Sequence, residues 1–373
     1  DNIISPLGYS SEENYQNMKN GISKAVLHQH AFNLPEPFFG SLLNWEEIEA
    51  QFSQLPQKAC RYTRFEKIAI LSAYKAIEAA KIDASSKDVL FVLSSTKGNI
   101  HLLENADGFD KNRINMGTSA KLLGEYFNNP NPVMVISNAC TSGVVAQIYA
   151  KEMMEAKGYK YAVVVGADIL SKFVISGFQS FKALSTERCK PFDLNRKGLN
   201  LGEGAASIVL EQSDNVPECA LCILGTGNRN DANHISGPSR TGEGLFNAIT
   251  AAYAFKQAFK ESLSFINAHG TATPYNDDME SWAISRSELE NIPTNSLKGF
   301  LGHTLGAAGV LECIISCHAL NEGIILPTLG HDTKGVVKEI TVNTELKHGE
   351  GNSFLKIISG FGGSNAAIIY GKK

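Results

Sequence analysis

Residues 132–157 read PVMVISNACTSGVVAQIYAKEMMEAK. The first part, 133–139, is a short and mostly apolar run, which is typical of a strand buried in a sheet. From 141 to 157 apolar side chains recur at helical spacing, so we expect the chain to pass from a strand directly into a helix. Cys140 lies at the junction. A strand followed at once by a helix is the unit from which α/β folds are built.

Similar apolar runs occur along the whole chain and alternate with helical stretches such as 64–80. We expect further strands at 91–96, 161–168, 205–211, 220–227, 263–268, 340–346, 355–360 and 366–371. Continuous apolar strands that alternate with helices predict an α/β fold whose sheets are buried on both faces. The stretch 20–57 shows the least periodicity, and we interpret it as an insertion or a cap.

The length and composition are typical of a large globular protein. The chain has 373 residues, of which 43% are hydrophobic and 19% charged, so we expect one large domain or two fused halves. The net charge of −4 does not support general binding to nucleic acid or membranes. No apolar run is long enough to span a bilayer, and the first residues, DNIISPLG, do not resemble a signal peptide. We expect a first strand that is short or lacks its beginning.

The seven cysteines are an odd number at irregular spacing: Cys60, Cys140, Cys189, Cys219, Cys222, Cys313 and Cys317. Free thiols in a reducing cytoplasm are the simplest interpretation. Cys219 and Cys222 form a CxxC within an apolar run, and we favour a structural strand over a metal or redox site. No second pair lies at zinc spacing. Cys313 and Cys317 share one helix face and are expected to pack in the core.

A weak internal repeat relates the two halves of the chain. Ser-Asn-Ala-Cys at 137–140 ends one strand and Ile-Asn-Ala-His at 266–269 ends another. Each places a reactive side chain at the carboxyl end of a strand, where α/β sheets form their sites. We therefore expect two related halves, residues 1–212 with the cysteine and residues 213–373 with the histidines. Their strand ends would meet about a pseudo-twofold axis.

Cys140 has the setting of a nucleophile, although a buried structural cysteine at a tight turn is an equal alternative from this segment alone. The start of the following helix directs N–H groups and partial positive charge at the sulfur, which is expected to lower the pKa of the thiol. The same N–H groups are suited to hold an oxyanion when the thiol attacks a thioester.

Two histidines lie in loops rich in glycine and threonine. His269 lies in NAHGTATPYND, and His303 precedes the small residues 306–309, which permit a close approach of backbones. One such histidine is more often a core or surface residue, but two beside a cysteine at a strand end indicate a site. Lys298 and Glu312 flank His303 and are candidates to orient it, with a solvated ion pair as the alternative.

Five segments, in this order, resemble the signature motifs of the β-ketoacyl synthase family. They are ACTSG at 139–143, KPFDLNRKGLNLGEGAA at 190–206, HGTATPYND at 269–277, KGFLGHTLGAAGVLE at 298–312 and SGFGGSNA at 359–366. Each motif is weak alone, whereas their order and spacing along the chain are specific.

The resemblance implies a thiolase-like fold, with two related halves in a five-layered αβαβα arrangement, and a homodimer or a heterodimer. Cys140 would take an acyl chain from an acyl carrier protein as a thioester. Malonyl carrier protein would then lose carbon dioxide while His269 and His303 donate hydrogen bonds to its thioester oxygen. The resemblance implies no metal and no organic cofactor.

Supporting roles also follow from the resemblance. Lys298 and Glu312 would support the histidines, and the backbone N–H groups of Cys140 and Phe361 would form an oxyanion hole. Phe361, followed by Gly362, would gate the acyl pocket, although the same glycine-rich segment is also consistent with a simple tight turn.

The threonines after the first histidine complete the implied site. Thr271 and Thr273 would line the path of the carrier arm, and Asp277 would brace their loop. The pair of histidines, His269 and His303, fits the elongating enzymes with a Cys-His-His site better than the initiating enzymes or the thiolases.

Three positions depart from the family pattern. Leu199 and Asn200 replace an aromatic-aliphatic pair, and Ser359 stands where an aromatic residue is common. We expect these positions to lie at the acyl pocket and its gate, so the acyl chain is expected to differ from a saturated fatty acid. The TATPYND form resembles synthases of aryl-polyene or flexirubin-type pigments.

Acyl carrier proteins are acidic, so we expect a local basic patch despite the negative net charge. Candidates are Lys58, Arg61, Arg64, Lys67, Lys111, Arg113 and Lys190. An ordinary solvated surface is an equal alternative. The second hypothesis for the whole chain is an inactive partner that shapes the acyl pocket of a synthase heterodimer, but such partners usually lack the cysteine at the strand end.

Overall fold

Two five-stranded sheets form the frame of the molecule in the computed structural model, which describes residues 1–218, 220–231, 233, 237–253 and 262–372. The first sheet has the order β1-β8-β6-β4-β5 and consists of β1 (Asn2–Ile4), β4 (Val89–Ser94), β5 (Met134–Ile136), β6 (Tyr161–Asp168) and β8 (Gly204–Glu211). The second has the order β11-β10-β14-β15-β9 and consists of β9 (Leu221–Asn230), β10 (Leu263–Asn267), β11 (Thr294–Asn295), β14 (Ser353–Gly360) and β15 (Ser364–Lys372).

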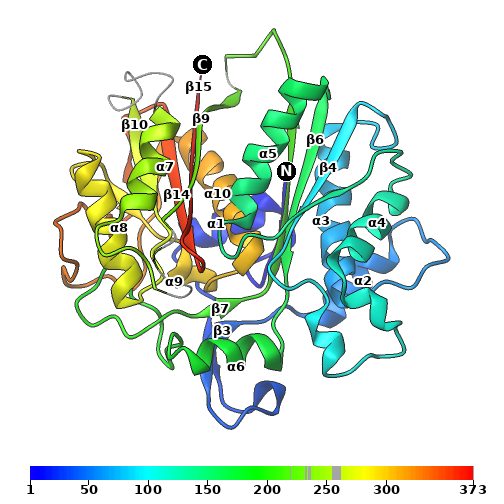
Figure 1. The fold of residues 1–373 in the computed structure, drawn as a ribbon, viewed down its shortest axis with the longest axis horizontal. Coiled ribbons are helices and arrows are strands. Elements are labelled where there is room, and N and C mark those ends of the chain that lie inside the picture. Colours follow the sequence, from blue (N-terminus) through cyan, green and yellow to red (C-terminus); the bar gives the residue numbers. More distant parts are fainter. Residues whose placement is uncertain (219, 232, 234–236, 254–261, 373) are drawn as a thin grey trace.

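Helices separate the two sheets and cover their outer faces. They are α1 (Ser11–Lys19), α2 (Trp45–Ser53), α3 (Arg64–Ala80), α4 (Met116–Tyr126), α5 (Ser142–Lys157), α6 (Lys172–Ser180), α7 (Glu243–Tyr253), α8 (Pro274–Arg286), α9 (Lys298–Leu301) and α10 (Ala308–Glu322). By their contacts the layers are α3, the first sheet, α5 with α10, the second sheet, and α7 with α8. Figure 1 shows α5 and α10 between the two sheets. One apolar cluster fills the space between the first sheet and α3, and another fills the space between the second sheet and α7 with α8. A third surrounds the central helices α5 and α10 and reaches both sheets.

The two sheets repeat one topology. Read from β5, neighbouring strands of the first sheet are parallel, parallel, antiparallel and antiparallel. The second sheet shows the same series when it is read from β11. The strands also follow one another along the chain in the same order, so the predicted duplication is confirmed. The boundary predicted at 212/213 lies in the segment between β8 and β9 and stays a prediction.

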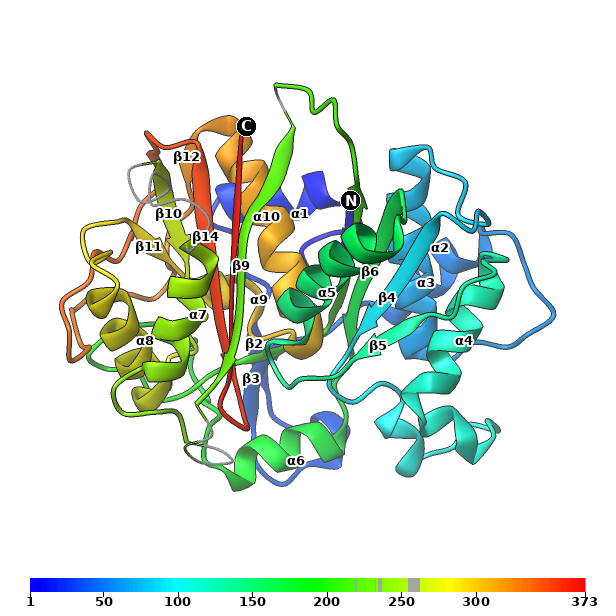
Figure 2. The ribbon, with the colours of Figure 1, turned by 45° about the horizontal axis from the view of Figure 1, so that its top comes forward.

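The pairing that we inferred within the repeat is wrong. Cys140 follows β5, whereas His269 follows β10, which occupies the place of β4 in the second sheet. The strand equivalent to β5 is β11, and His303 lies between β11 and α10. Cys140 and His303 are therefore the equivalent positions, each shortly before one of the central helices α5 and α10. Figure 2 shows these two helices between the sheets. The Asn-Ala dipeptide precedes both Cys140 and His269, but strand order decides which positions are equivalent.

Most elements lie where the sequence predicts them, including α3, α5 and β6. The strand expected at 340–346 is absent from this part of the described chain. Only Val342 forms a bridge, to Thr294. Because β11 has only two residues and lies at the sheet edge, it offers too short a partner for a further strand.

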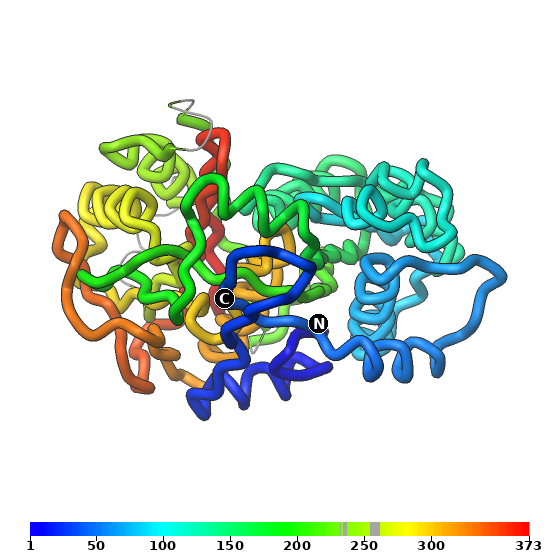
Figure 3. The backbone as a smooth tube through the Cα atoms, turned by 90° about the horizontal axis from the view of Figure 1, so that it is seen from below, coloured from blue at the N-terminus to red at the C-terminus, as the bar shows by residue number. Residues whose placement is uncertain are grey.

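Part of the stretch 20–57 forms a cap, as predicted, whereas α2 in the same stretch packs against α3 in the outer layer. Strands β2 (Val26–His28) and β3 (Phe38–Ser41) pair with β7 (Leu201–Gly202) in a small sheet at one end of the molecule. This end faces the viewer in Figure 3. Side chains of the cap pack with α6 in a fourth apolar cluster, which fixes the position of α6 below the sheets.

The cysteines agree with the prediction of free thiols. The six in the described part of the chain form no disulfide, and Cys222 lies in β9. Cys219, the other half of the CxxC, lies outside the described residues. Cys313 and Cys317 belong to the central core, as predicted. Over the same described residues, no helix is both long enough and apolar enough to cross a membrane.

The two central helices touch through their backbones near their first turns. A Cβ atom on Gly309 would lie 2.5 Å from the nitrogen of Val144, and one on Gly143 would lie 2.8 Å from the nitrogen of Val310. Real Cβ atoms do not approach backbone so closely. Both glycines are therefore needed for α5 and α10 to start side by side.

The glycine contact predicts a stability effect. Gly309→Ala should lower the free energy of unfolding by about 1–3 kcal/mol, because the added methyl group overpacks the helix contact. Urea unfolding followed by circular dichroism measures this difference. Gly177→Ala on α6 is the control, because nothing lies within 4 Å of its added methyl group, and it should be neutral or stabilising. Equal effects of the two substitutions would contradict the importance of the contact.

Candidate active site

The backbone around Cys140 forms a sharp elbow between β5 and α5. Ala139 has a positive φ of 47°, which lies in the left-handed region that residues with a side chain rarely adopt. The hydroxyl of Thr141 donates to the carbonyl of Asn138 at 2.7 Å, and the hydroxyl of Ser142 accepts from the N–H of Asn138 at 2.8 Å. These local bonds hold the strained turn and direct the Cys140 side chain towards the second half of the molecule.

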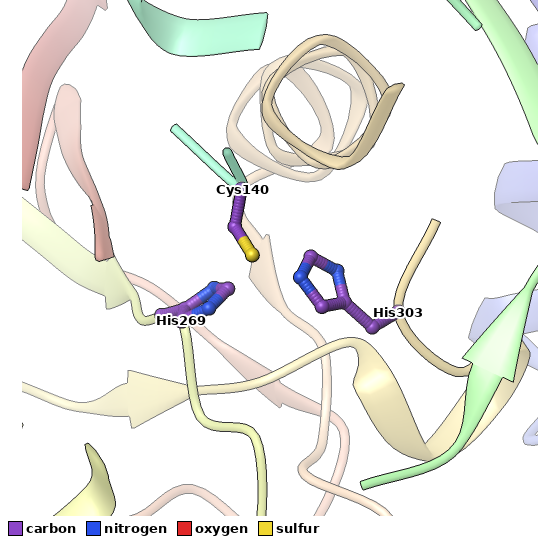
Figure 4. Close-up of side chains that lie close together, drawn as sticks. All are labelled: Cys140, His269 and His303. Carbon is purple, nitrogen blue, oxygen red and sulfur yellow. The ribbon is translucent and has the colours of Figure 1, made fainter. Parts of the chain in front are cut away.

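Three reactive side chains meet at this elbow. Figure 4 shows the sulfur of Cys140 directed between the rings of His269 and His303. The sulfur and one nitrogen of each ring all lie within 4.8 Å of one another, and all three side chains are buried. The ring centroids are 5.0 Å apart, with planes almost perpendicular at 81°. The structure therefore brings together the cysteine and both histidines that the sequence singled out.

The hydrogen bonds of His303 determine which of its nitrogens carries the proton. Its Nδ1 lies 3.2 Å from the backbone nitrogen of Leu305 and accepts that N–H. In a neutral ring the proton then resides on Nε2. This Nε2 is buried and has no partner among the described residues, and neither has Nδ1 of His269. An unpaired buried donor is costly, so a substrate oxygen is the expected partner.

Both histidines are neutral. Burial lowers the pKa of His269 and of His303 well below the ordinary value, and the nearby ammonium group of Lys298 lowers both further. A neutral imidazole donates a hydrogen bond through one nitrogen and can accept a proton at the other, whereas a protonated ring can only donate.

The expectation of a lowered thiol pKa is wrong for Cys140 in this structure. Burial raises the pKa of the Cys140 thiol to about 11, although Lys298, Lys97 and its own backbone N–H act in the opposite direction. The side chain is 8% exposed, so little water reaches a thiolate there. The loss of hydration outweighs the partial charges of the helix start.

Behind the histidines lies a buried group of charges that we call the Lys-Glu-Lys cluster: Lys298, Glu312 and Lys356. One carboxylate oxygen of Glu312 pairs with Lys298 and the other with Lys356. Burial by itself would raise the pKa of Glu312, but the two ammonium groups outweigh it and lower that pKa. The sequence singled out Lys298 and Glu312 but missed Lys356, a charged residue in the apolar run FLKIISG that could have been noticed.

Two carboxylates hold the loop that carries His269. Glu280 accepts the N–H groups of His269 and Gly270, each at 2.7 Å. Asp277 accepts the N–H of Thr271 at 3.0 Å, and burial raises its pKa to about 6. The sequence pointed to Asp277 but not to Glu280, which lies one turn further along α8 and on the same side.

A cavity of about 550 Å³ leads from the surface to the three reactive side chains. Of the residues that the sequence singled out, those that line it are Cys140, His269, His303, Thr271, Thr273, Phe361 and Gly362. The remaining ones, Lys298, Glu312 and Asp277, lie behind its wall. The hydroxyls of Thr271 and Thr273 are 2.8 Å apart on one side of the cavity.

Aromatic rings surround Phe361 at the tip of the hairpin between β14 and β15. Phe361 is 38% exposed and stacks on Phe178 at 5.9 Å, while Phe181 meets it edge-on at 5.4 Å. The neighbouring Gly360 lies so close to the elbow that a Cβ atom there would be 3.1 Å from the nitrogen of Cys140. The hairpin tip and the nucleophile thus share one wall of the cavity.

Two of the three departures from the family pattern lie at the cavity. Leu199 and Ser359 line it. The expectation that Asn200 also lies there is wrong, because its side chain accepts the N–H of Cys189 at 2.7 Å and donates to the carbonyl of Glu187 at 2.9 Å. Asn200 ties two loops together and does not line the cavity.

Part of the proposed basic patch is engaged within the chain. Arg113 pairs with the buried Glu66, and its side chain is largely covered, so it is not available to a partner. Lys67 pairs with Glu49 at 2.6 Å, and Lys190 lies 3.4 Å from Asp332. The cavity itself carries two other lysines at its wall, Lys182 and Lys197.

Cysteine and histidine are also zinc ligands, and Cys140, His269 and His303 are the side chains of the described residues that lie close enough for a metal ion. A zinc site would need the cysteine as thiolate. Without a metal ion, the raised pKa of Cys140 keeps the thiol protonated.

The chain is similar in sequence to β-ketoacyl synthases. The profile of the β-ketoacyl synthase N-terminal domain matches residues 4–215, and that of the C-terminal domain matches residues 221–332. The tetracenomycin polyketide synthase ketoacyl synthase alpha subunit of Streptomyces glaucescens is 33% identical over 263 residues, or 64% of this chain and 59% of that protein. The 3-oxoacyl-[acyl-carrier-protein] synthase 2 of Rhizobium meliloti is 31% identical over 277 residues, or 69% of this chain and 64% of that protein.

The matched region thus spans about three fifths of the length of these two relatives. Among solved structures, a ketosynthase in complex with its chain length factor from Xenorhabdus doucetiae has a TM-score of 0.85 at 23% identity. That comparison covers 100% of this chain and 96% of the other and confirms the predicted thiolase-like fold. Because the N-terminal profile alone matches more than half of the sequence, the chain belongs to the β-ketoacyl synthase family.

Proposed function

We propose that this protein is an elongating 3-oxoacyl-[acyl-carrier-protein] synthase, an acyltransferase that condenses malonyl carrier protein with an acyl chain held on Cys140. The observation that carries the proposal is the meeting of one thiol and two neutral histidines at the end of an open cavity. No other group in the described cavity wall combines a nucleophile with unpaired imidazole nitrogens.

The first half-reaction is a thioester exchange. The sulfur of Cys140 attacks the carbonyl carbon of the acyl thioester, and the carrier thiol leaves with the proton that the cysteine gives up. Because the thiol of Cys140 is protonated at neutral pH, that proton needs a path, and a neutral imidazole within 4.8 Å of the sulfur supplies one. The backbone N–H groups of Cys140 and Phe361 are the proposed oxyanion hole.

The second half-reaction joins two carbon atoms. The malonyl group loses carbon dioxide, and the resulting enolate carries negative charge on the thioester oxygen. His269 and His303 donate hydrogen bonds to that oxygen. The enolate carbon then attacks the acyl thioester on Cys140, and the released sulfur takes up a proton. The Nε2–H of His303 supports this role, because it is a buried donor without an acceptor among the described residues.

The remaining site residues bind the substrate or support the reacting groups. Thr271 and Thr273 line the path of the carrier arm, and Asp277 braces their loop through the N–H of Thr271. Lys298 and Glu312 support the histidines from behind. Phe361 and Gly362 form the gate of the acyl pocket.

The wall of the cavity favours a flat, unsaturated acyl chain. Phe178, Phe181 and Phe361 present aromatic faces, on which a conjugated chain stacks well. This agrees with the expected place in polyketide or pigment polyene synthesis, with fatty acid synthesis as the alternative.

The proposed partner is an acyl carrier protein, with this chain acting in the cytoplasm as a homodimer or as one member of a heterodimer. Lys182 lies in the cavity wall, where it suits an acidic carrier, whereas Lys197 in the same wall pairs with Glu187 at 3.0 Å. The structural relative bound to a chain length factor supports the heterodimer. The complete trio of Cys140, His269 and His303 supports the catalytic member over the inactive partner.

Loading of Cys140 tests the function directly. After incubation with an acyl carrier protein that bears an acyl chain, mass spectrometry should find that chain on Cys140, and addition of malonyl carrier protein should yield a ketoacyl product. Cys140→Ala should give neither, whereas Cys189→Ala, at another buried thiol, should give both. Absence of adduct and product in the unaltered protein across a panel of acyl chains would favour the inactive partner.

The role of His303 predicts a loss of rate. His303→Ala should lower kcat for condensation by about 10²–10³-fold, because one donor to the enolate oxygen is removed. His318→Ala on the outer part of α10 is the matched control and should leave kcat unchanged. A loss below about threefold in His303→Ala would exclude the histidine as an essential donor.

The raised pKa of Cys140 predicts the pH dependence of alkylation. Thiolate is the reactive form, so the rate of inactivation by iodoacetamide should rise about tenfold per pH unit from pH 7 to 9 without levelling off. The rise continues because the folded-state pKa of about 11 lies above this range. Rates of inactivation at fixed reagent concentration provide the measurement. A plateau below pH 8 would show that the helix start dominates over burial.

A further inference from the structure

Lys356 is a buried cation that the reaction described so far does not use. It lies in the middle of β14 with 0% of its surface exposed, and its neighbours in the strand, Leu355 and Ile357, are equally buried. Lysine is rarely so completely covered unless its charge has partners. We therefore expect polar partners around its ammonium group.

The ammonium group of Lys356 has two partners that lead to the active site. It pairs with Oε2 of Glu312, and it donates to the carbonyl of Ala268 at 3.2 Å. Ala268 directly precedes His269, at the end of β10. Strand β14 runs parallel to β10, with Lys356 opposite Asn267. Lys356 thus fastens the strand end from which His269 projects.

The Lys-Glu-Lys cluster carries one positive charge more than it needs. Glu312 already pairs with Lys298 through its other oxygen. A single lysine would neutralise this carboxylate, and burying a second ammonium group costs free energy that an apolar side chain would avoid. The surplus charge lies close enough to lower the pKa of both His269 and His303.

Other ionisable groups face the same region. Glu280 on α8 accepts the N–H of His269, and burial raises its pKa to about 7. Cys313 on α10 lies near Lys356, and burial raises its pKa to about 12, so it is neutral. Burial lowers the pKa of Lys356 itself, but Glu312 acts in the opposite direction. The carboxylate of Glu312 and the carbonyl of Ala268 stabilise the ammonium form of Lys356.

We propose that Lys356 is a positioning residue for the condensation, which holds the end of β10 through the carbonyl of Ala268 and adds a positive charge behind both histidines. This role rests on the proposed function. A proton added to His303 would lie on Nδ1, where it would oppose the N–H of Leu305 and turn the ring away. Burial disfavours that protonation, and the charges of Lys298 and Lys356 disfavour it further. The surplus charge also favours the negative enolate in front of the histidines.

Two substitutions separate the charge of Lys356 from its hydrogen bonds. Lys356→Met removes both, and Lys356→Gln keeps a donor for Glu312 and Ala268 but carries no charge. Glu312 retains Lys298 in either variant, so no buried carboxylate is left unpaired. Ile358→Met, two residues along the same strand face, is the control for packing.

Two measurements decide the outcome. In both variants kcat for malonyl decarboxylation should fall about 10–100-fold, with KM for malonyl carrier protein within about twofold of the unaltered protein. NMR signals of the histidine rings, assigned with His269→Asn and His303→Asn, should titrate at a higher pH than in the unaltered protein. Ile358→Met should change neither.

The result can overturn the proposal. If Lys356→Gln recovers kcat and leaves both histidine titrations unchanged, Lys356 acts only through its hydrogen bonds and the proposal is wrong. If Lys356→Met fails to fold, the glutamine variant alone decides. If the unaltered protein condenses nothing but the histidine titrations still shift in the variants, the proposed function fails while the electrostatic role of Lys356 stands.

Discussion

The contact between the backbones of α5 and α10 is the constraint on which the site depends. Each helix begins shortly after a reactive residue: α5 begins at Ser142, just after Cys140, and α10 begins at Ala308, one 3-10 turn after His303. Because Gly143 and Gly309 have no side chains, the first turns of both helices lie against each other. A bulkier residue at either position would separate the helices and, with them, the sulfur and the imidazole. Close packing of the two helices therefore determines how the sulfur of Cys140 and the imidazole of His303 lie relative to each other.

Burial then sets the protonation of the site. The cavity ends among groups that have lost most of their water, so the thiol of Cys140 keeps its proton and both histidines remain neutral. The charges that the site does use lie behind it, in the Lys-Glu-Lys cluster. This separation places neutral donors in contact with the substrate and a net positive charge one layer away. In the proposed mechanism, the neutral donors and the positive charge behind them stabilise the enolate, and no metal ion takes part.

The prediction from sequence was strongest where one short segment contains both cause and effect. The strand, elbow and helix at Cys140 follow from local hydrophobic patterns, and so do α3 and β6. It was weaker where pairing between distant segments decides the result. The strand expected at 340–346 had the right pattern but only a two-residue neighbour, β11. The apparent equivalence of Cys140 and His269 rested on matching letters, whereas the strand order of the sheets pairs Cys140 with His303.

The sequence by itself determined the family, the order of the motifs and the reactive residue types, because these are properties of local spacing along the chain. Only the tertiary structure decided which charges share a carboxylate and which groups lose their water. Lys356 lies 58 positions from Lys298 in the sequence, and no local pattern relates them, yet both contact Glu312. The pKa of Cys140 likewise followed from burial by segments remote in sequence and not from the adjacent helix. Desolvation depends on everything packed around an atom, and that information exists only once the chain has folded.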